Sequence, residues 1–127
     1  MAQDKMMTQT LTSLLEAGET IQHPIYGSLM QGKHFWYGYF CLTDTHLLIA
    51  LLDGNTNKIH WTTRVPLDVE DLRIQRNGLL SQNKIHILFK DGRTCSIRAS
   101  QKVMGIKGQD VNLAAFIDTL QKKIDIG

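Results

Sequence analysis

Hydrophobic and polar positions alternate in short runs along most of the chain. From residue 19 to residue 100, runs of β-branched and aromatic residues are broken by Gly, Asn and Asp about every ten residues, as in β-sandwiches and barrels. The pattern therefore predicts seven strands, near residues 20–30, 35–43, 46–52, 58–66, 69–76, 83–90 and 93–99.

Near the N-terminus the apolar spacing is that of a helix rather than a strand. Residues 8–17 are expected to form a short helix, with Gly18 as its C-terminal stop. Its apolar face would consist of Leu11, Leu14 and Leu15.

The C-terminal segment predicts a longer amphipathic helix over residues 110–124, with Asp110 or Asn112 as its N-cap. Its apolar stripe consists of Leu113, Phe116, Ile117, Leu120 and Ile124. Such a stripe most simply closes one end of a sheet or barrel. Docking of this helix to a partner is the alternative.

The apolar pattern also selects a register for the last predicted hairpin. A two-residue loop at Asp91-Gly92 would mix apolar and polar side chains on each face, whereas a three-residue loop over residues 90–92 separates them. This loop needs Gly92 in the left-handed conformation. The expected pairs are Ile87 with Cys95 and Ile85 with Ile97 facing the core, and Leu88 with Thr94 and His86 with Ser96 on the other side.

Length and composition indicate one globular domain over residues 1–127. Of the 127 residues, 43% are hydrophobic and 20% charged, as in proteins that bury a substantial core. No apolar run of signal-peptide length follows the N-terminus. The apolar stretch at residues 34–52 has Asp44 at its centre, so it is interpreted as two strands rather than a membrane span. Cys41 and Cys95 lack a C-x-x-C spacing and are predicted to be reduced, buried thiols of a cytoplasmic protein.

The net charge of +2 is distributed unevenly. Residues 58–107 hold ten Lys or Arg against four Asp or Glu, a net charge of +6, whereas residues 1–57 carry −3 and residues 108–127 carry −1. A basic block of this size can bind an anionic partner. Its charges nevertheless come singly at strand spacing, which is typical of a solvated sheet face, so both interpretations stay open.

No group of residues predicts catalysis. Glu70 and Asp71 would point to opposite faces of a strand, which is a poor arrangement for acid–base chemistry. No serine stands in a G-x-S-x-G motif, neither cysteine has a partner histidine beside it, and no phosphate-binding glycine loop is present. The histidines fall on different predicted strands without metal-ligand spacing: His23, His34, His46, His60 and His86. The chain is therefore expected to have no catalytic site, metal or cofactor.

The segment Gly105-Ile106-Lys107-Gly108 matches the G-x-x-G loop with which KH domains clamp a nucleic-acid backbone. In KH domains this loop lies between two helices, whereas here a strand precedes it and only the last helix follows. The two glycines are interpreted as the connection into that helix, and nucleic acid is not expected as a partner.

Two apolar groups are candidates for an interaction surface. The aromatic run at residues 35–40 is dense enough to cover both faces of a strand, so part of it is expected to contact a partner. The other group is a leucine pair that follows the Asn77-Gly78 turn. The candidate residues are Trp36, Tyr37, Trp61, Leu79 and Leu80.

Several short segments stand in an order that is known from a protein family. Residues 15–19 read L-x-x-G-E, and residues 39–49 contain an L-T-D turn between two apolar runs, with His46 where the family usually has Arg. Residues 65–72 begin with Val-Pro-Leu and end in a further leucine, and an Asp-Gly hairpin and a terminal helix follow. Over residues 8–124 this order resembles bacterial pleckstrin-homology-like (PH-like) and GRAM-like domains.

The resemblance implies a mainly β fold of α+β character. Such a fold is a PH-like barrel of two near-orthogonal antiparallel sheets with seven strands, capped by a C-terminal amphipathic helix and here preceded by a short N-terminal helix. In lipid-binding members the ligand lies among the first, third and sixth strand-connecting loops. The corresponding basic residues here are Lys33, His34, Lys58, Lys90 and Arg93. Specific inositol phosphate binding is not expected, because residues 35–38 replace the further basic residues that it requires.

Members of this family usually bind rather than catalyse. The chain is therefore interpreted as a non-enzymatic binding or assembly module of the bacterial cytoplasm, acting on a protein partner or on a second copy of itself. The first alternative is recognition of an anionic ligand or lipid surface through the basic loops. The second is a small-molecule carrier or enzyme on an NTF2-like or small-barrel fold, which would require an interior cavity with converging polar groups.

Overall fold

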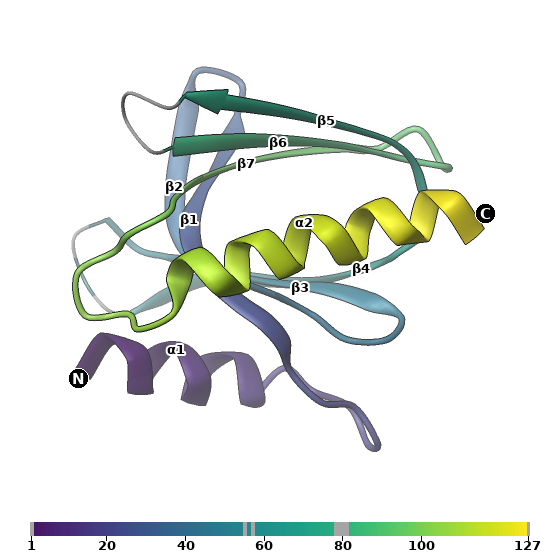
Figure 1. Cartoon of the computed structure of the whole chain (residues 1–127). Coiled ribbons are helices and arrows are strands. Elements are labelled where there is room, and N and C mark those ends of the chain that lie inside the picture. Colours follow the sequence, from purple (N-terminus) through teal and green to yellow (C-terminus); the bar gives the residue numbers. More distant parts are fainter. Residues whose placement is uncertain (1, 55, 57, 78–81, 127) are drawn as a thin grey trace.

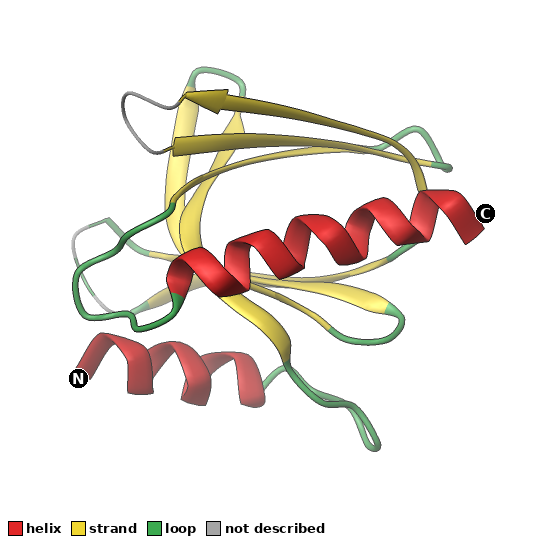
Figure 2. Cartoon of the chain, viewed as in Figure 1, coloured by secondary structure: helices red, strands yellow, loops and turns green. Residues whose placement is uncertain are grey.

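The seven predicted strands are present, and a helix stands at each end of the chain (Figure 2). The computed structural model describes residues 2–54, 56, 58–77 and 82–126. In chain order the elements are α1 (Ala2–Thr12), β1 (Gln22–Gln31), β2 (His34–Leu42), β3 (His46–Leu52), β4 (Ile59–Pro66), β5 (Val69–Asn77), β6 (Gln82–Phe89), β7 (Thr94–Ser100) and α2 (Gln109–Ile126).

The strands form one antiparallel sheet in the order β4-β3-β2-β1-β7-β6-β5. Strand β1 pairs with β2 along most of its length but with β7 only at Ser28 and Leu29. The sheet turns at this short contact, so that β5, β6 and β7 lie on the other side of the core from β3 and β4 (Figure 1). The two layers expected for a PH-like fold are therefore parts of one continuous sheet, and β1 belongs to both.

The predicted register of the β6–β7 hairpin is confirmed. Ile85 pairs with Ile97 and Ile87 with Cys95, and the two polar-side pairs also match. Gly92 has a φ of 92°, which a side chain would oppose, and its N–H donates to the carbonyl oxygen of Phe89 at 2.9 Å. The alternation of apolar and polar residues was sufficient to select this register because one face of the hairpin is buried.

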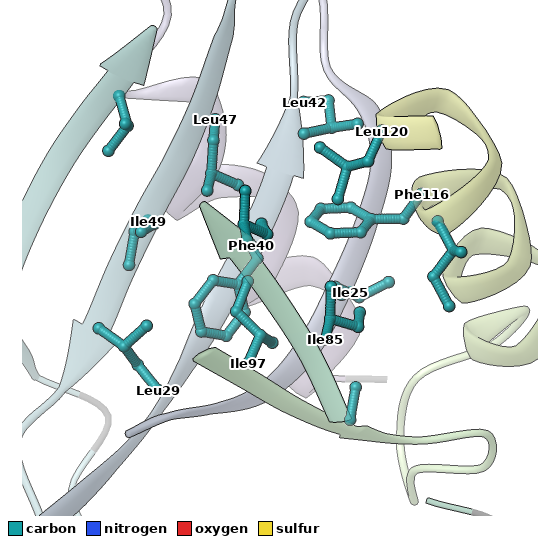
Figure 3. Packing of buried hydrophobic residues seen from close by; sticks show 14 of the residues in the cluster. Ile25, Leu29, Phe40, Leu42, Leu47, Ile49, Ile85, Ile97, Phe116 and Leu120 are labelled. Carbon is teal, nitrogen blue, oxygen red and sulfur yellow. The ribbon is translucent and has the colours of Figure 1, made fainter. Parts of the chain in front are cut away.

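The main hydrophobic core fills the space between the two sheet layers, and α2 lies across it (Figure 1). Phe116 and Leu120 of α2 are fully buried against Ile25, Leu42 and Ile85 of the sheet (Figure 3). The predicted stripe of α2 is confirmed, since its first four residues are buried and the last packs partly buried against the core: Leu113, Phe116, Ile117, Leu120 and Ile124. The helix begins at Gln109, so the expected N-caps, Asp110 and Asn112, lie inside it.

The prediction of a helix over residues 8–17 was wrong in its bounds, because α1 spans Ala2–Thr12. Among the residues of α1 whose burial the structure describes, Met7 and Leu11, one turn apart, are buried against the outer face of β2 and β3. Leu14 and Leu15 join the same cluster from the turns after the helix. Leucines in a turn cannot be told from leucines in a helix by spacing alone, and the helix therefore ends at Thr12, five residues before its predicted end at residue 17.

Glu19, the last residue of the L-x-x-G-E segment, forms an ion pair with Arg64. The Nη1 and Nη2 atoms of Arg64 donate to its carboxylate at 2.7 and 2.8 Å, and the N–H of Glu16 donates to it at 2.8 Å. The hydrogen bond from Arg64 is the main cause that lowers the pKa of Glu19 to about 2. His46, which stands where the family usually has Arg, lies 4.0 Å from the same carboxylate. Glu19 and His46 belong to the motif segments and lie together with Arg64, so these two motif residues have a structural role.

Candidate functional site

The core opens to the surface between β4 and the turn that joins β6 to β7. The opening is a pocket of about 230 Å³ whose floor includes the core residues Leu29, Ile49 and Phe89. Its rim carries Trp61 and Arg93. We call this opening, defined by these five residues, the mouth. An apolar floor beside a cationic rim suits an apolar side chain with an anionic group next to it.

One wall of the mouth is β4, which is an edge strand of the sheet. It is hydrogen-bonded to β3 on one side, and among the described residues no strand pairs with its other side. Ile59 and Trp61 of this strand are 42% and 43% exposed. An unpaired edge with exposed apolar side chains is a template for another strand, and proteins usually block such edges unless they use them.

A β-bulge at His60 shapes the beginning of β4. Trp61 pairs with Leu51 and Ile59 with Leu52, so His60 is the extra residue between them. The bulge directs its ring onto Trp36 of β2, with ring centroids 4.5 Å apart and planes 4° from parallel. Trp36 in turn packs against the main core. The exposed half of β4 is therefore held in a fixed position beside the mouth.

Four of the five predicted basic residues lie in the expected turns and His34 begins β2, but the structure places only Arg93 among the residues that line the mouth. The Nε atom of Arg93 donates to Oδ2 of Asp91 at 2.7 Å, and the bonds from Arg93 hold the pKa of Asp91 below its usual range. The other basic residues are exposed, and the described part of the chain shows them in no ion pair: Lys33, His34, Lys58 and Lys90. The cation that the structure places at the mouth is therefore Arg93, which is paired with Asp91.

The predicted interaction surface is divided between the two faces of the sheet. Trp36 and Trp61 lie on the core side, near the mouth, whereas Tyr37 lies on the outer face and stacks on Tyr26. Residues 79 and 80, the leucine pair of the sequence prediction, lie outside the described residues. The sequence analysis did not single out Ile59 and His60. Ile59 could have been found from the sequence, because it is a β-branched residue at the start of a predicted strand. No sequence pattern indicates the bulge at His60.

The two cysteine thiols are candidate nucleophiles, and neither is suited to nucleophilic catalysis. Cys95 lines the mouth and Cys41 is buried under α1; both are free. Burial raises the pKa of each thiol to about 12, so both are protonated at neutral pH, and a thiol is a poor nucleophile.

The described part of the chain brings together no group of three or more His, Cys, Asp or Glu side chains that would suit a metal ion. Neither of its helices is both long and apolar enough to cross a bilayer.

Comparison with known proteins shows the fold. No protein-family model and no curated protein sequence matches the chain. Among solved structures, the hSac2 domain of human phosphoinositide phosphatase Sac2 matches with a TM-score of 0.61 at 16% identity, over 98% of this chain and 82% of that one. The C-terminal domain of an unknown protein from Leishmania infantum matches with a TM-score of 0.59 at 14% identity, over 89% and 93%.

A third solved structure contains a PH domain by description. The linker-DH/PH domains of p115-RhoGEF match with a TM-score of 0.53 at 10% identity, over 94% of this chain and 33% of the longer one. At such identities the likeness establishes architecture alone. Together with the seven-stranded sheet and its closing helix, it shows that the chain has a PH-like fold.

Proposed function

We propose that the chain is a non-enzymatic, cytoplasmic binding module that recognises a protein partner by strand addition to β4. In this mode an extended segment of the partner pairs with the free edge of the sheet and inserts a side chain into a neighbouring pocket. The observation that carries the proposal is the edge of β4, which no described strand pairs with: Ile59 and Trp61 are exposed on it, and Trp61 lines the mouth.

The geometry supports a bound strand better than an enclosed small molecule. The floor of the mouth is apolar, with Leu29 and Phe89 of the main core, whereas a carrier needs polar groups that converge on its ligand. The stack of His60 on Trp36 holds the edge in place before the partner arrives, which lowers the conformational cost of binding. The fold forms part of a longer chain in p115-RhoGEF, which agrees with the role of a module.

Charge around the mouth favours a partner segment with acidic residues. Arg93, paired with Asp91, lies on the rim, and the turns β1–β2, β3–β4 and β6–β7 carry the exposed residues Lys33, Lys58 and Lys90. A second copy of the chain, paired β4 to β4, would bring the same positive charges together, and like charges across an interface oppose association. We therefore assign the site to an acidic, strand-forming segment of another protein rather than to a homodimer.

Peptide display against the whole chain tests the proposal. A library of random peptides should yield sequences in which apolar residues alternate with other residues and acidic residues are enriched. A selected peptide should shift the amide signals of residues 59–63 in NMR spectra and change the tryptophan fluorescence. Trp61→Ser and Arg93→Gln should each weaken its binding about tenfold, the usual cost of losing an anchor or a charged hydrogen bond at an interface.

Two controls separate strand addition from simple attraction. Alternate N-methylation of the selected peptide removes its strand hydrogen bonds and should abolish binding. Phe35→Ser changes an equally exposed aromatic side chain on the other face of the sheet and should leave the affinity unchanged. Equal binding of the N-methylated peptide would overturn the proposal. So would a stable dimer of the chain with residues 59–63 protected in its interface.

A further inference from the structure

A second pocket lies on the outer face of the sheet, where β1 turns away from β7. It has a volume of about 260 Å³ and is lined on one side by Tyr26, Phe35 and Tyr37 and on the other by Arg98 and Lys102. We call it the outer pocket. Because Tyr37 and Trp36 are neighbours on one strand and point to opposite faces, the outer pocket and the mouth are separate sites.

The aromatic wall of the outer pocket is exposed and fixed in position. Tyr26 and Tyr37 stack with centroids 6.0 Å apart and planes 8° from parallel, and Phe35 meets Tyr37 edge-on at 5.7 Å. Phe35 and Tyr37 are nevertheless 51% and 49% exposed. Aromatic side chains that are held rigidly and left open to solvent offer contact area at little entropic cost.

The opposite wall carries positive charge that the fold leaves uncompensated. Arg98 on β7 stands directly across from Lys84 on β6, and like charges in this position on one sheet face destabilise a strand pair. The Nε atom of Arg98 is buried and has no hydrogen-bond partner among the described residues. Lys102 adds a further positive charge, and none of the described residues that line the pocket is acidic.

An anion would offset this positive charge. An oxyanion beside the guanidinium of Arg98 would counter the repulsion between Arg98 and Lys84, and a guanidinium is the side chain best suited to a phosphate. A phosphate monoester carries nearly two negative charges at neutral pH, which matches the two cations that line the pocket, Arg98 and Lys102. The aromatic wall then faces whatever the phosphate is attached to.

We propose that the outer pocket binds an organic phosphate whose body is a flat or apolar group, with Arg98 and Lys102 on the phosphate and Phe35 and Tyr37 against the body. This site lies on the other face of the sheet from the mouth, is lined by other residues and takes another kind of ligand. A negative result for one proposal therefore does not contradict the other. The same phosphate chemistry occurs in small soluble molecules and in lipid headgroups, and the experiment distinguishes these sources.

Titration of the whole chain with phenyl phosphate and with inorganic phosphate, followed by NMR, tests the site. Phenyl phosphate should bind more tightly and shift the amide signals of residues 26–28, 35–37 and 98–102. Arg98→Gln should weaken its binding about tenfold, the usual cost of a lost charged hydrogen bond. Tyr37→Ala should reduce the preference for phenyl phosphate over inorganic phosphate.

Matched variants keep the outcome interpretable. Arg93→Gln removes an arginine at the mouth and should leave the affinity for phenyl phosphate unchanged. Lys102→Gln, at an exposed position outside the strands, serves if Arg98→Gln fails to fold, and should also weaken binding. If phenyl phosphate and inorganic phosphate bind equally, or the shifted amides lie around Lys33 and Lys58 instead, the proposal is wrong.

Sedimentation with vesicles identifies the source of the phosphate. The chain should not bind vesicles of phosphatidylcholine alone. These vesicles are the control for vesicles that also contain phosphatidic acid, which carries a phosphate monoester headgroup. Binding to the latter that is lost in Arg98→Gln would assign the site to a lipid headgroup. Phenyl phosphate binding without vesicle binding would assign it to a soluble phosphate, and absence of both would overturn the proposal.

Discussion

Two glycines face each other across β1 and β2 and allow the sheet to fold tightly. Gly27 pairs with Gly38, and each lies against the backbone of a further strand. A Cβ atom at Gly27 would lie 2.6 Å from the carbonyl oxygen of Arg98, and one at Gly38 would meet the carbonyl oxygen of Ala50 even more closely. Neither oxygen can move without displacing a strand.

We therefore expect Gly38→Ala to lower the free energy of unfolding by about 2 kcal/mol or more, as overpacking against backbone does. Gly18→Ala is the matched control. Gly18 has a φ of 83° but no atom within 4 Å of an added Cβ, so only the conformational cost of about 1 kcal/mol should appear. Urea denaturation measures both variants, and equal losses would contradict the steric argument.

The Glu19–Arg64 pair should make stability depend on acid pH. The pKa of Glu19 is about 2 in the folded chain against an ordinary 4.5, so the folded state holds the proton less tightly. The stabilising contribution is thus complete above pH 4.5 and is lost as the pH falls towards 2.

Glu19→Gln removes this titration. The variant should be less stable than the unmodified chain at neutral pH. The difference should shrink as the pH falls below 4.5 and be mostly lost near pH 2, where Glu19 is half protonated in the folded state. Thermal unfolding between these pH values measures the effect. Asp118→Gln, in an exposed helix pair with Lys122, is the control and should show little dependence. A constant difference at all pH values would exclude the ion pair as its cause.

At the scale of elements, α2 is joined to the sheet by one buried amide. The Oε1 atom of Gln109 accepts from the N–H of Tyr26 at 3.1 Å, and its Nε2 donates to the carbonyl oxygens of Tyr26 and Ser100 at 2.8 and 3.1 Å. Strand β7 has already separated from β1 at this point, since their pairing is confined to Ser28 and Leu29. The side chain of Gln109 therefore takes the place of a missing strand residue.

Gln109→Ala would leave the main-chain N–H and carbonyl oxygen of Tyr26 without their partner in a partly buried position. We expect a loss of about 2 kcal/mol in the free energy of unfolding, the usual cost of an unsatisfied buried polar group. Hydrogen exchange at the Tyr26 amide should accelerate beyond what the global loss explains. Asp110→Ala, exposed on the next residue, is the control. Unchanged protection at Tyr26 would show that another group or water satisfies it.

How far the sequence predicted these elements depended on burial. The β6–β7 register and the stripe of α2 followed from apolar spacing, because each has one buried and one open face. The α1 bounds and the role of Gln109 did not follow, since a turn can bury leucines and a buried glutamine has no periodic signal. The basic residues at the turns could be named from the resemblance. The pairing of Arg98 with Lys84 also follows from the predicted β6–β7 register, but the sequence analysis used that register only to place apolar residues.

At the scale of the whole molecule, the sheet separates two hydrophobic clusters. The main core lies between the sheet layers under α2, and a smaller cluster lies on the outer face under α1. Each cluster contains one free cysteine: Cys95 packs against the main core, and Cys41 lies under α1. The two thiols therefore report separately on the two sides of the sheet.

We expect α1 to detach without unfolding of the main core, because its buried contacts are few and lie on the outer face alone. Leu11 is fully buried, so Leu11→Asp places a charge in the outer cluster and should free the helix. Labelling of Cys41 by a thiol reagent at neutral pH should then accelerate about tenfold or more, whereas the rate at Cys95 should stay unchanged. Thr12→Asp introduces the same charge at an exposed neighbour and is the control. Parallel acceleration at both cysteines would instead show that the two clusters open together, and that α1 is part of one cooperative unit with the sheet.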